Sequence, residues 1–348
     1  MSFTKKLYKL FHWEFWPVYM FYIPNSFYVL YRVWKERSFT FFTLTNPGID
    51  NSGIGTESKF KTLQIIPKKY LPKTLYHNAN TSIKKTIKCL QKDGFTYPII
   101  VKPDIGFRGL LVKKINSEKE FISYINNKPV NFIIQQFIDL PNECGVFFIR
   151  HPKESIGKIT SITLKKCPTV IGNGRNTILE LIQKDKHLSL FKDQIEFLSN
   201  IDINIVPKKG KTLQITSIGN HSKGTKFISG NDLINKKLIN TFNELNKEIK
   251  GWFYGRVDIK YDSWEDVENG KFKIIELNGI LGEPTHIYDT SKMNYFKALK
   301  IMRLHWKDLY AIATYNHKTG IPYKGRKEFF RELKELKRYT KQVKSLSK

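Results

Sequence analysis

The run GRVDI at residues 255–259, followed by IIELN at 274–278, decides the fold. Both runs alternate apolar with polar residues, which predicts two neighbouring strands. Because successive side chains of a strand point to opposite faces, Glu276 and Asn278 share one face, and Asp258 lies in phase with them. Two carboxylates and an amide oxygen suit Mg²⁺, with Mn²⁺ as the alternative, whose other ligands are water and phosphate oxygens. An isolated Glu-x-Asn pair is usually only a polar strand face, and the upstream Asp258 makes it specific.

Two segments upstream suggest a site for a polyphosphate. In PIIVKPDIGFRG, residues 98–109, a buried strand delivers Lys102 and a glycine-containing loop follows. A lysine at a strand end neutralises phosphate oxygens, and glycines let backbone N–H groups approach them closely. In FIIQQFIDLPNE, residues 132–143, an apolar strand leads into a linker that ends at Glu143. Backbone groups of this linker would be able to read an adenine edge, with Glu143 bonding the ribose hydroxyls. Taken singly, each segment is also compatible with an ordinary turn.

The rest of the chain alternates helices with strands, an α+β pattern that we expect to form mixed sheets without an internal repeat. We expect Ser117 and Glu120 to form a capping box. The expected elements are a helix over Thr81–Asp93, strands over Tyr97–Lys102 and Leu110–Ile115, a helix from Ser117, a strand over Phe132–Phe137, a hairpin of Gly145–Arg150 and Lys158–Leu164, helices over Thr177–Gln183 and Leu233–Lys250, and strands over Gly255–Tyr261 and Lys271–Leu277.

In the order of these segments, residues 81–300 resemble the ATP-grasp superfamily, particularly the branch of D-alanine–D-alanine ligase and cyanophycin synthetase. Residues 169–181 are similar to a turn and helix of the cyanophycin synthetase type. The resemblance implies an ATP-grasp fold, in which two α+β lobes clasp ATP. It also implies a carboxylate–amine ligase that forms a C–N bond through an acyl phosphate and releases ADP and phosphate. An ATP-grasp phosphotransferase and a non-catalytic, membrane-associated nucleotide-binding protein are the alternatives.

The resemblance also implies a role for each residue of the motifs. The residues that would bind ATP are Lys102, Gly106 and Gly109 at the phosphates, Gln136, Phe137 and Ile138 at the adenine, and Glu143 at the ribose. Asp258, Glu276 and Asn278 match the Mg²⁺ ligands. Arg256 matches the arginine that meets the acyl phosphate, and Arg256 and Arg108 would stabilise the developing negative charge. Lys165, at a strand end, is a second phosphate candidate or else a solvated lysine.

The substrate side departs from the family pattern. The sequence after Asn278 reads NGILGEPTH and lacks the usual Pro-Gly loop, so we do not expect D-alanine as the amine. The usual N-terminal lobe is replaced by an aromatic segment and the loop TLTNPGIDNSGIGTESKF at 43–60. In this loop Asn46, Ser52 and Glu57 either line a substrate site or belong to a surface turn. In GNHSKGT, 219–225, His221 and Lys223 either touch substrate from a lid or sit in a polar hairpin turn.

The first 42 residues and the basic tail suggest a membrane surface. Fourteen aromatic residues lie between Phe11 and Phe42. Pro24 interrupts the apolar run, so we expect two short helices, the second N-capped by Ser26, rather than one transmembrane span. The segment is either an interfacial anchor or buried aromatic packing. The tail predicts a basic amphipathic helix that lies on an anionic membrane, pairs with another chain or docks on the body. Its apolar stripe is Phe329, Leu333, Leu336, Thr340 and Val343.

The amino-acid composition limits which binding partners and which cellular compartment we expect. The chain of 348 residues has 59 basic and 31 acidic residues, a net charge of +28 that invites an anionic partner or reflects a lysine-rich surface. Only 10 of the basic residues are arginine, which argues against nucleic acid. Three scattered cysteines without a CxxC motif fit a reducing compartment. We therefore expect a cytoplasmic protein that acts on a small-molecule or lipid-linked acid and amine. In one interpretation, the protein is associated with the inner face of the membrane.

The expected organisation has five parts. They are an aromatic segment at 1–42, a loop region at 43–80, a small ATP-grasp lobe at 81–140, a larger lobe with the Mg²⁺ site at 141–320, and the basic tail helix at 321–348. The sequence does not determine the oligomeric state.

Overall fold

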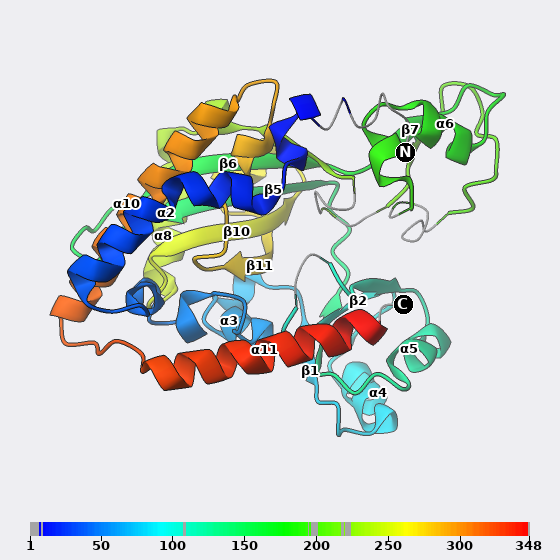
Figure 1. The fold of residues 1–348 in the computed structure, drawn as a ribbon. Helices are drawn as coiled ribbons and strands as arrows, with labels where there is room; N and C mark the ends of the chain where they lie inside the picture. Colours follow the sequence, from blue (N-terminus) through cyan, green and yellow to red (C-terminus); the bar gives the residue numbers. More distant parts are fainter. Residues whose placement is uncertain are drawn as a thin grey trace.

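The computed structural model describes residues 7, 10–106, 109–193, 195, 201–216, 219 and 224–346. It contains two lobes, each built on its own sheet (Figure 1). The sheet of the small lobe has the strand order β1-β4-β2-β3, and that of the large lobe has the order β11-β10-β5-β6-β9. A separate pair, β7 and β8, lies with helix α6 in an outlying unit of the large lobe. The expected α+β class is confirmed.

The elements have the following bounds. The strands are β1 (Thr74–His77), β2 (Ile99–Pro103), β3 (Lys113–Ile115), β4 (Phe132–Gln136), β5 (Asn142–Ile149), β6 (Lys158–Lys166), β7 (Thr169–Ile171), β8 (Thr212–Gln214), β9 (Lys226–Ser229), β10 (Tyr254–Tyr261) and β11 (Lys273–Asn278). The main helices are α2 (Val18–Glu36), α3 (Lys59–Gln64), α4 (Ile83–Lys92), α5 (Glu118–Ile125), α6 (Ile178–Lys184), α8 (Lys236–Glu248), α9 (Trp264–Glu268), α10 (Tyr295–Lys318) and α11 (Arg326–Leu346).

The expectation of mixed sheets is wrong, because every pairing among the described strands is antiparallel. In the small lobe, α4 joins β1 to β2, and α5 joins β3 to β4. Each of these helical connections links two strands that run the same way, but a third strand lies between them. The crossovers are therefore split, and no parallel neighbours result. Strand β1 belongs to this sheet, so the lobe includes residues before Thr81.

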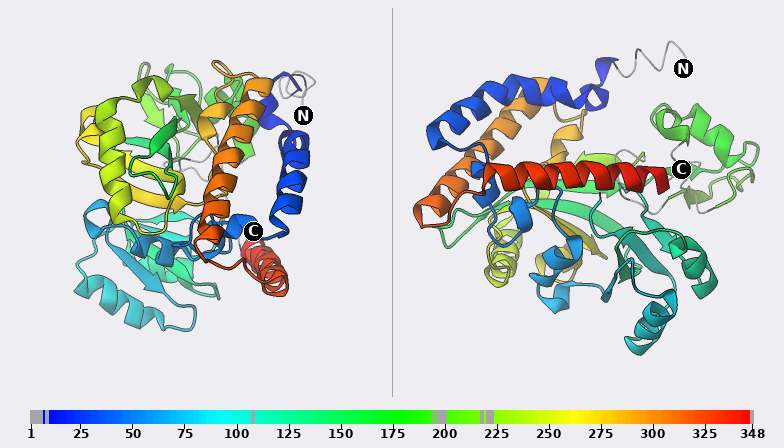
Figure 2. Two further views of the ribbon diagram at one scale, coloured as in Figure 1. Left: turned by 90° about the vertical axis from the view of Figure 1, so that its left-hand side faces the viewer. Right: turned by 60° about the horizontal axis from the view of Figure 1, so that its bottom comes forward.

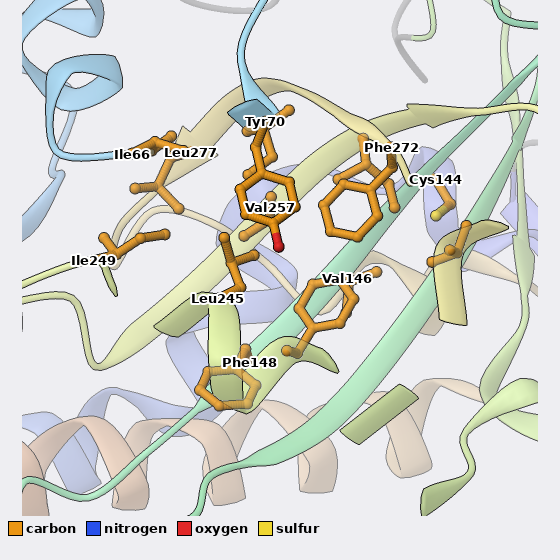
Figure 3. Close-up of a cluster of buried hydrophobic side chains, with 14 of the residues drawn as sticks. Ile66, Tyr70, Cys144, Val146, Phe148, Leu245, Ile249, Val257, Phe272 and Leu277 are labelled. Carbon is orange, nitrogen blue, oxygen red and sulfur yellow. The ribbon is translucent and has the colours of Figure 1, made fainter. Parts of the chain in front are cut away.

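One face of the large sheet is apolar and forms the main core. Side chains at alternate positions of β5 and β10, among them Val146, Phe148 and Val257, pack against Leu245 of α8 (Figure 3). Trp252 is fully buried and stacks on Phe148, with 5.9 Å between the ring centroids. Because strand side chains alternate, the intervening residues of β5 and β10 point to the opposite face, and several of them are charged.

Helix α5 begins directly after Ser117, the predicted N-cap, but without the predicted capping box. The Ser117 hydroxyl accepts a hydrogen bond from the N–H of Glu120 at 3.2 Å. The Glu120 carboxylate instead accepts from the N–H of Asn116 at 2.8 Å, and Lys113 pairs with its other oxygen at 3.1 Å. The N-cap at Ser117 is therefore confirmed. The predicted reciprocal bond, from the N–H of Ser117 to the Glu120 carboxylate, is wrong because Asn116 and Lys113 occupy that carboxylate.

Helix α2 runs without a break through Pro24, where the sequence predicted two helices broken near this proline. Pro24 has no N–H to bond the carbonyl of Met20. The hydroxyl of Tyr295 on α10 donates to that carbonyl instead, so the helix continues through the proline. Ser26, the predicted N-cap, donates its hydroxyl to the carbonyl of Ile23 at 2.7 Å. Within the described part of the chain, each helix is too short or too polar to span a bilayer.

Helix α2 lies along α10, on the side away from the large sheet (Figure 2). Tyr22 stacks on Trp306 with 5.8 Å between centroids, and Arg32 bonds Thr314 at 3.2 Å. Part of the aromatic segment is thus packed on the body. The other side of α2 carries exposed large side chains, among them Phe27 and Trp34.

The tail helix α11 docks on the body by its apolar stripe. Phe329 and Val343 are buried near its two ends. Phe329 packs against Phe42 of the aromatic segment, whereas Val343 belongs to the core of the small lobe. The helix therefore bridges the two lobes, and its basic residues face outward.

Two buried histidines make stability depend on pH. Burial lowers the pKa of His286 to about 4 and that of His305 to about 3. In the unfolded chain both titrate near the ordinary value of about 6.5. As the pH falls below 6.5, the unfolded chain therefore takes up protons that the folded protein does not, and stability decreases. Down to pH 4, we expect each imidazole to lower the free energy of unfolding by roughly 3 kcal/mol.

Chemical denaturation at several pH values would check this expectation. Replacing His286 or His305 by Asn should reduce the slope of the free energy of unfolding between pH 6.5 and pH 4. His317 is exposed, so His317→Asn is the matched control and should leave the slope unchanged. Equal slopes in all three variants would contradict the argument.

Candidate functional site

The polar face of the large sheet gathers the charged residues of the motifs. Asp258 on β10 lies directly opposite Glu276 on β11, and Arg256 lies opposite Asn278. On its other side, Asp258 faces Gly145 of β5. The strand alternation seen in the sequence therefore places these side chains on one face, as predicted.

Asp258 is the centre of this group. Its carboxylate is 2% exposed and accepts from Lys165 Nζ at 2.9 Å, from Arg256 Nε at 3.2 Å and from Asn278 Nδ2 at 3.1 Å. Burial by itself would raise the pKa of Asp258, but Arg256 and Lys165 outweigh it and hold the pKa below its ordinary value. Asp258 is therefore anionic at neutral pH.

Glu276 lies at the junction with the small lobe. Its carboxylate pairs with Lys59 Nζ, and Lys102 Nζ of β2 donates to the carbonyl of Ile275 at 2.9 Å. Burial opposes ionisation of Glu276, yet Lys59 and Lys102 lower its pKa well below the ordinary value. Burial lowers the pKa of Lys102 to about 8, with Lys59 adding to the effect and Glu276 opposing it. The two lobes thus meet through opposite charges.

Glu143 opens the polar face at the start of β5. It pairs with Lys165 Nζ at 2.7 Å, so Lys165 bridges Glu143 and Asp258. Burial alone would lower the pKa of Lys165, but these two carboxylates raise it above its ordinary value. Gly219 lies against Glu143, because a Cβ at that position would come within 2.6 Å of Glu143 Oε1. Lys165 is a buried, ion-paired member of the group rather than a solvated lysine.

The expected adenine segment connects the lobes. Gln136 ends β4 of the small lobe, and its side-chain Nε2 donates to the carbonyl of Thr96 at 2.8 Å. The N–H of Phe137 donates to the carbonyl of Pro98 at 3.3 Å, and Lys114 Nζ lies 3.9 Å from the Phe137 ring centroid. Ile138 follows in the linker to β5. The structure therefore puts these three residues at the hinge between the two sheets.

The glycine loop after β2 is described only in part. Gly106 packs beside Pro103, and Gly109 has a φ of +71°, which favours glycine. Arg108, expected to be catalytic, lies outside the described residues. His221 and Lys223, expected to touch substrate, also lie outside them.

The loop at 43–60 divides into a structural part and a part near the site. Asn46 is fully buried, and its side chain bonds only to backbone groups, accepting from the N–H groups of Phe253 and Tyr254 and donating to the carbonyls of Tyr254 and Ser52. The hydroxyl of Ser52 accepts from the N–H of Asn46 at 2.8 Å and donates to the carbonyl of Thr43 at 2.7 Å. The side chains of Asn46 and Ser52 are thus engaged in holding the loop.

Glu57 and Lys59 lie closer to the charged group. Lys59 pairs with Glu276, and the Glu57 carboxylate accepts from the N–H of Gly55 at 2.5 Å. Burial raises the pKa of Glu57, while Lys59 opposes the shift. The loop is tied to the end of β11, where the N–H of Ile280 donates to the carbonyl of Ser52 at 2.9 Å.

The sequence did not assign a role to Glu283, which lies in the NGILGEP segment. Its carboxylate accepts from the hydroxyls of Tyr22 and Tyr288, the latter at 2.6 Å. Its carbonyl accepts from Arg256 Nη1 at 3.2 Å. Tyr22 is on α2, so the aromatic segment reaches the candidate site. The position of Glu283, five residues after Asn278, was the only sequence signal for it.

The donor set fits a cation that also binds phosphate. Among the described residues, no three His, Cys, Asp or Glu side chains are grouped closely enough to hold a metal ion by themselves. Asp258 and Glu276 supply two anionic carboxylates, and a half-turn of the Asn278 amide would present its oxygen beside Asp258. Mg²⁺ commonly takes one or two carboxylates and completes its shell with water and phosphate. A Cβ at Gly145 would fall 3.0 Å from Asp258 Oδ1, so the glycine keeps room beside this carboxylate.

Comparisons with known proteins give structural likeness only. No protein-family model and no curated protein matches the chain. A bifunctional glutathione synthetase from Pasteurella multocida is 14% identical, with a TM-score of 0.37, over 72% of this chain and 36% of that one. VanG D-Ala:D-Ser ligase from Enterococcus faecalis is 13% identical, with a TM-score of 0.43, over 74% and 64%. D-alanine–D-alanine ligase from Bacillus anthracis is 16% identical, with a TM-score of 0.41, over 75% and 72%. The chain thus spans less than two thirds of the first two.

Proposed function

We propose that this chain is an ATP-grasp enzyme that joins a carboxylate to an amine at the expense of ATP. One observation carries the proposal. At the junction of two α+β lobes, the polar face of one sheet brings Asp258, Glu276 and Asn278 together, and Lys102 reaches them from the other lobe. A nucleotide held between two lobes requires cations that bind its phosphates and oxygen ligands that bind Mg²⁺, and this arrangement supplies both.

In this proposal, the lysines hold the triphosphate. Lys165 is buried between Glu143 and Asp258, and Lys102 donates to the carbonyl of Ile275 next to Glu276, so their charges are positioned before a ligand arrives. Lys59 and Lys165 now neutralise Glu276 and Asp258, and they would turn toward phosphate oxygens when the carboxylates bind Mg²⁺. Bound Mg²⁺ would screen the phosphate charge during attack by the substrate carboxylate.

The remaining residues would act on the acyl group and the nucleoside. The Arg256 guanidinium is held by Asp258 and by the Glu283 carbonyl, so it has a defined place from which to stabilise the oxyanion formed when the amine attacks the acyl phosphate. Arg108 is proposed for the same role. Gln136, Phe137 and Ile138 would border the adenine, Glu143 would bond the ribose, and Gly106 and Gly109 would approach the phosphates.

The substrates are proposed only as classes. They are a small-molecule or lipid-linked acid and amine, bound in the cytoplasm near the inner face of the membrane. Glu57, His221 and Lys223 remain proposed substrate contacts, with Glu283 added by the structure. Glu57 and Glu283 each place a carboxylate on a loop beside the charged group, which favours an amine substrate, because an ammonium group would donate to a carboxylate oxygen.

A screen of acid and amine pools with MgATP, read by mass spectrometry, tests the proposal. We expect ADP, free phosphate and an amide product only when the right acid and amine are present together. Phosphate retained on the acceptor would establish a phosphotransferase instead. ATP binding without turnover in any pool, in a protein that remains folded, would contradict the proposed ligase.

A further inference from the structure

The outward side of α2 is an uncovered apolar stripe. Its members recur at helical spacing on the side away from α10. Phe27 is 77% exposed and Trp34 is 75% exposed, although large aromatic side chains are usually buried. The stripe consists of Tyr19, Met20, Ile23, Phe27, Leu30, Tyr31 and Trp34. An apolar surface of this extent marks an interaction site.

The stripe continues onto neighbouring elements. On α10, Phe296 and Leu304 are exposed, and Arg303 of the same helix lies over the ring of Tyr28, 5.1 Å from its centroid. Beyond the end of α2, Phe39 stacks on Phe330 of α11 with 5.8 Å between centroids, and both are exposed. Exposed apolar side chains are therefore present on α2, on α10, and where Phe39 meets the start of α11.

The basic helix α11 lies on the same side of the molecule as α2. In the left view of Figure 2, both helices lie along one edge, and in Figure 1 both lie in front of the sheets. Helix α11 carries eight basic and three acidic residues. Its exposed cations include Lys334, Lys337 and Lys341, and Lys35 and Arg37 are exposed at the end of α2.

We propose that the outward stripe of α2 and the basic side of α11 form one docking surface for an anionic lipid bilayer. Exposed Trp, Tyr and Phe side chains suit the headgroup zone, where an apolar ring and a polar edge both find partners. Lysines beside them are attracted to anionic lipid. A second copy of the chain fits less well, because pairing this surface with itself would bring two basic α11 helices together in a protein of net charge +28.

The two docking helices also hold the two loops of the candidate site. Tyr22 of α2 donates to Glu283, which follows the proposed Mg²⁺ ligands. Glu332 of α11 accepts from Asn51 Nδ2 at 2.6 Å, and Lys324 Nζ donates to Asn51 Oδ1 at 2.8 Å. Asn51 belongs to the loop that delivers Lys59 to Glu276. This step rests on the proposed ligase function. The arrangement places the part of the site that would bind the acceptor substrate near the headgroups, so docking should raise turnover of a lipid-linked acceptor.

Vesicle sedimentation with the full chain tests the surface. We expect binding to phosphatidylcholine vesicles that contain phosphatidylserine, and at least tenfold weaker binding to phosphatidylcholine alone. The double variant Phe27→Glu/Trp34→Glu should bind at least about tenfold more weakly. Ile171 is 65% exposed on β7 in the outlying unit, so Ile171→Glu is the matched control and should bind like the unmodified chain.

Reversing the charge of three lysines on α11 gives a second, independent test of the docking surface. Lys334→Glu/Lys337→Glu/Lys341→Glu should weaken binding about a hundredfold, at about 1 kcal/mol for each lysine. Reversal of the exposed Lys208, Lys209 and Lys211, which lie next to β8, should weaken it far less.

Two outcomes would overturn the docking surface. One is equal binding by every variant. The other is a dimer, detected by light scattering, that becomes a monomer in the Phe27→Glu/Trp34→Glu variant, because the stripe would then bind a second copy of the chain. MgATP binding separates this inference from the proposed function. Failure of the unmodified chain to bind anionic vesicles, with nucleotide binding intact, rejects only the docking surface, whereas vesicle binding without nucleotide binding rejects only the enzyme.

Discussion

Replacing Asp258 by asparagine is expected to lower MgATP turnover about a thousandfold, which corresponds to roughly 4 kcal/mol of lost stabilisation of the transition state. The substitution keeps the shape of the side chain and removes its charge. Asp258 accepts from Lys165, Arg256 and Asn278, so the neutral amide weakens the proposed Mg²⁺ site and also releases two cations from their partner. Glu276→Gln should have a similar effect, because the two carboxylates lie directly opposite each other on β10 and β11.

The measurements are ADP release with the substrates that the screen identifies and Mg²⁺-dependent ATP binding by calorimetry. Glu265 on α9 is an exposed carboxylate, and Glu265→Gln should retain full activity. Because Asp258 neutralises buried cations, the melting temperature of each variant is measured as well. Full turnover in Asp258→Asn would remove the main support for the proposed metal site.

The second large effect is expected on stability. Asn46→Ala should lower the free energy of unfolding by roughly 4 kcal/mol, because it leaves the buried N–H groups of Phe253 and Tyr254 and the carbonyl of Tyr254 without their partner. Each unsatisfied buried group costs about 1–3 kcal/mol. Since the total stability of a protein is about 5–15 kcal/mol, a large part of it would be lost.

Thermal and chemical unfolding would measure this change, with a decrease of roughly 8 °C in the melting temperature. Asn80 is exposed in the small lobe, so Asn80→Ala is the matched control. If Asn46 contacted substrate instead, Asn46→Ala would raise KM and leave the melting temperature unchanged, and that result would contradict the structural role described above.

The part of the fold nearest the motifs could be predicted from the sequence. The hairpin of β5 and β6, the pair β10 and β11, the N-cap at Ser117 and the helix that follows Thr177 could be predicted from patterns a few residues long. The continuous α2 could not be predicted, because the hydroxyl that satisfies the carbonyl left free by Pro24 comes from Tyr295 on another helix. The split order of the small sheet could not be predicted either, since pattern alone does not say which strand inserts between two others.

The sequence by itself determined that Glu276 and Asn278 share one face of a strand, because alternation along a strand is a local property of the backbone. The register of β10 and β11 places Asp258 opposite Glu276 on that face. Only the tertiary structure decided which cations meet them. Lys102 and Lys59 reach the neighbourhood of Glu276 from more than 170 residues away, and Tyr22 reaches Glu283 across 261 residues. Only the tertiary structure, too, decided which side of the aromatic segment is packed and which is open. Such contacts depend on how lobes and helices dock, and docking depends on the summed burial of many side chains rather than on any one motif.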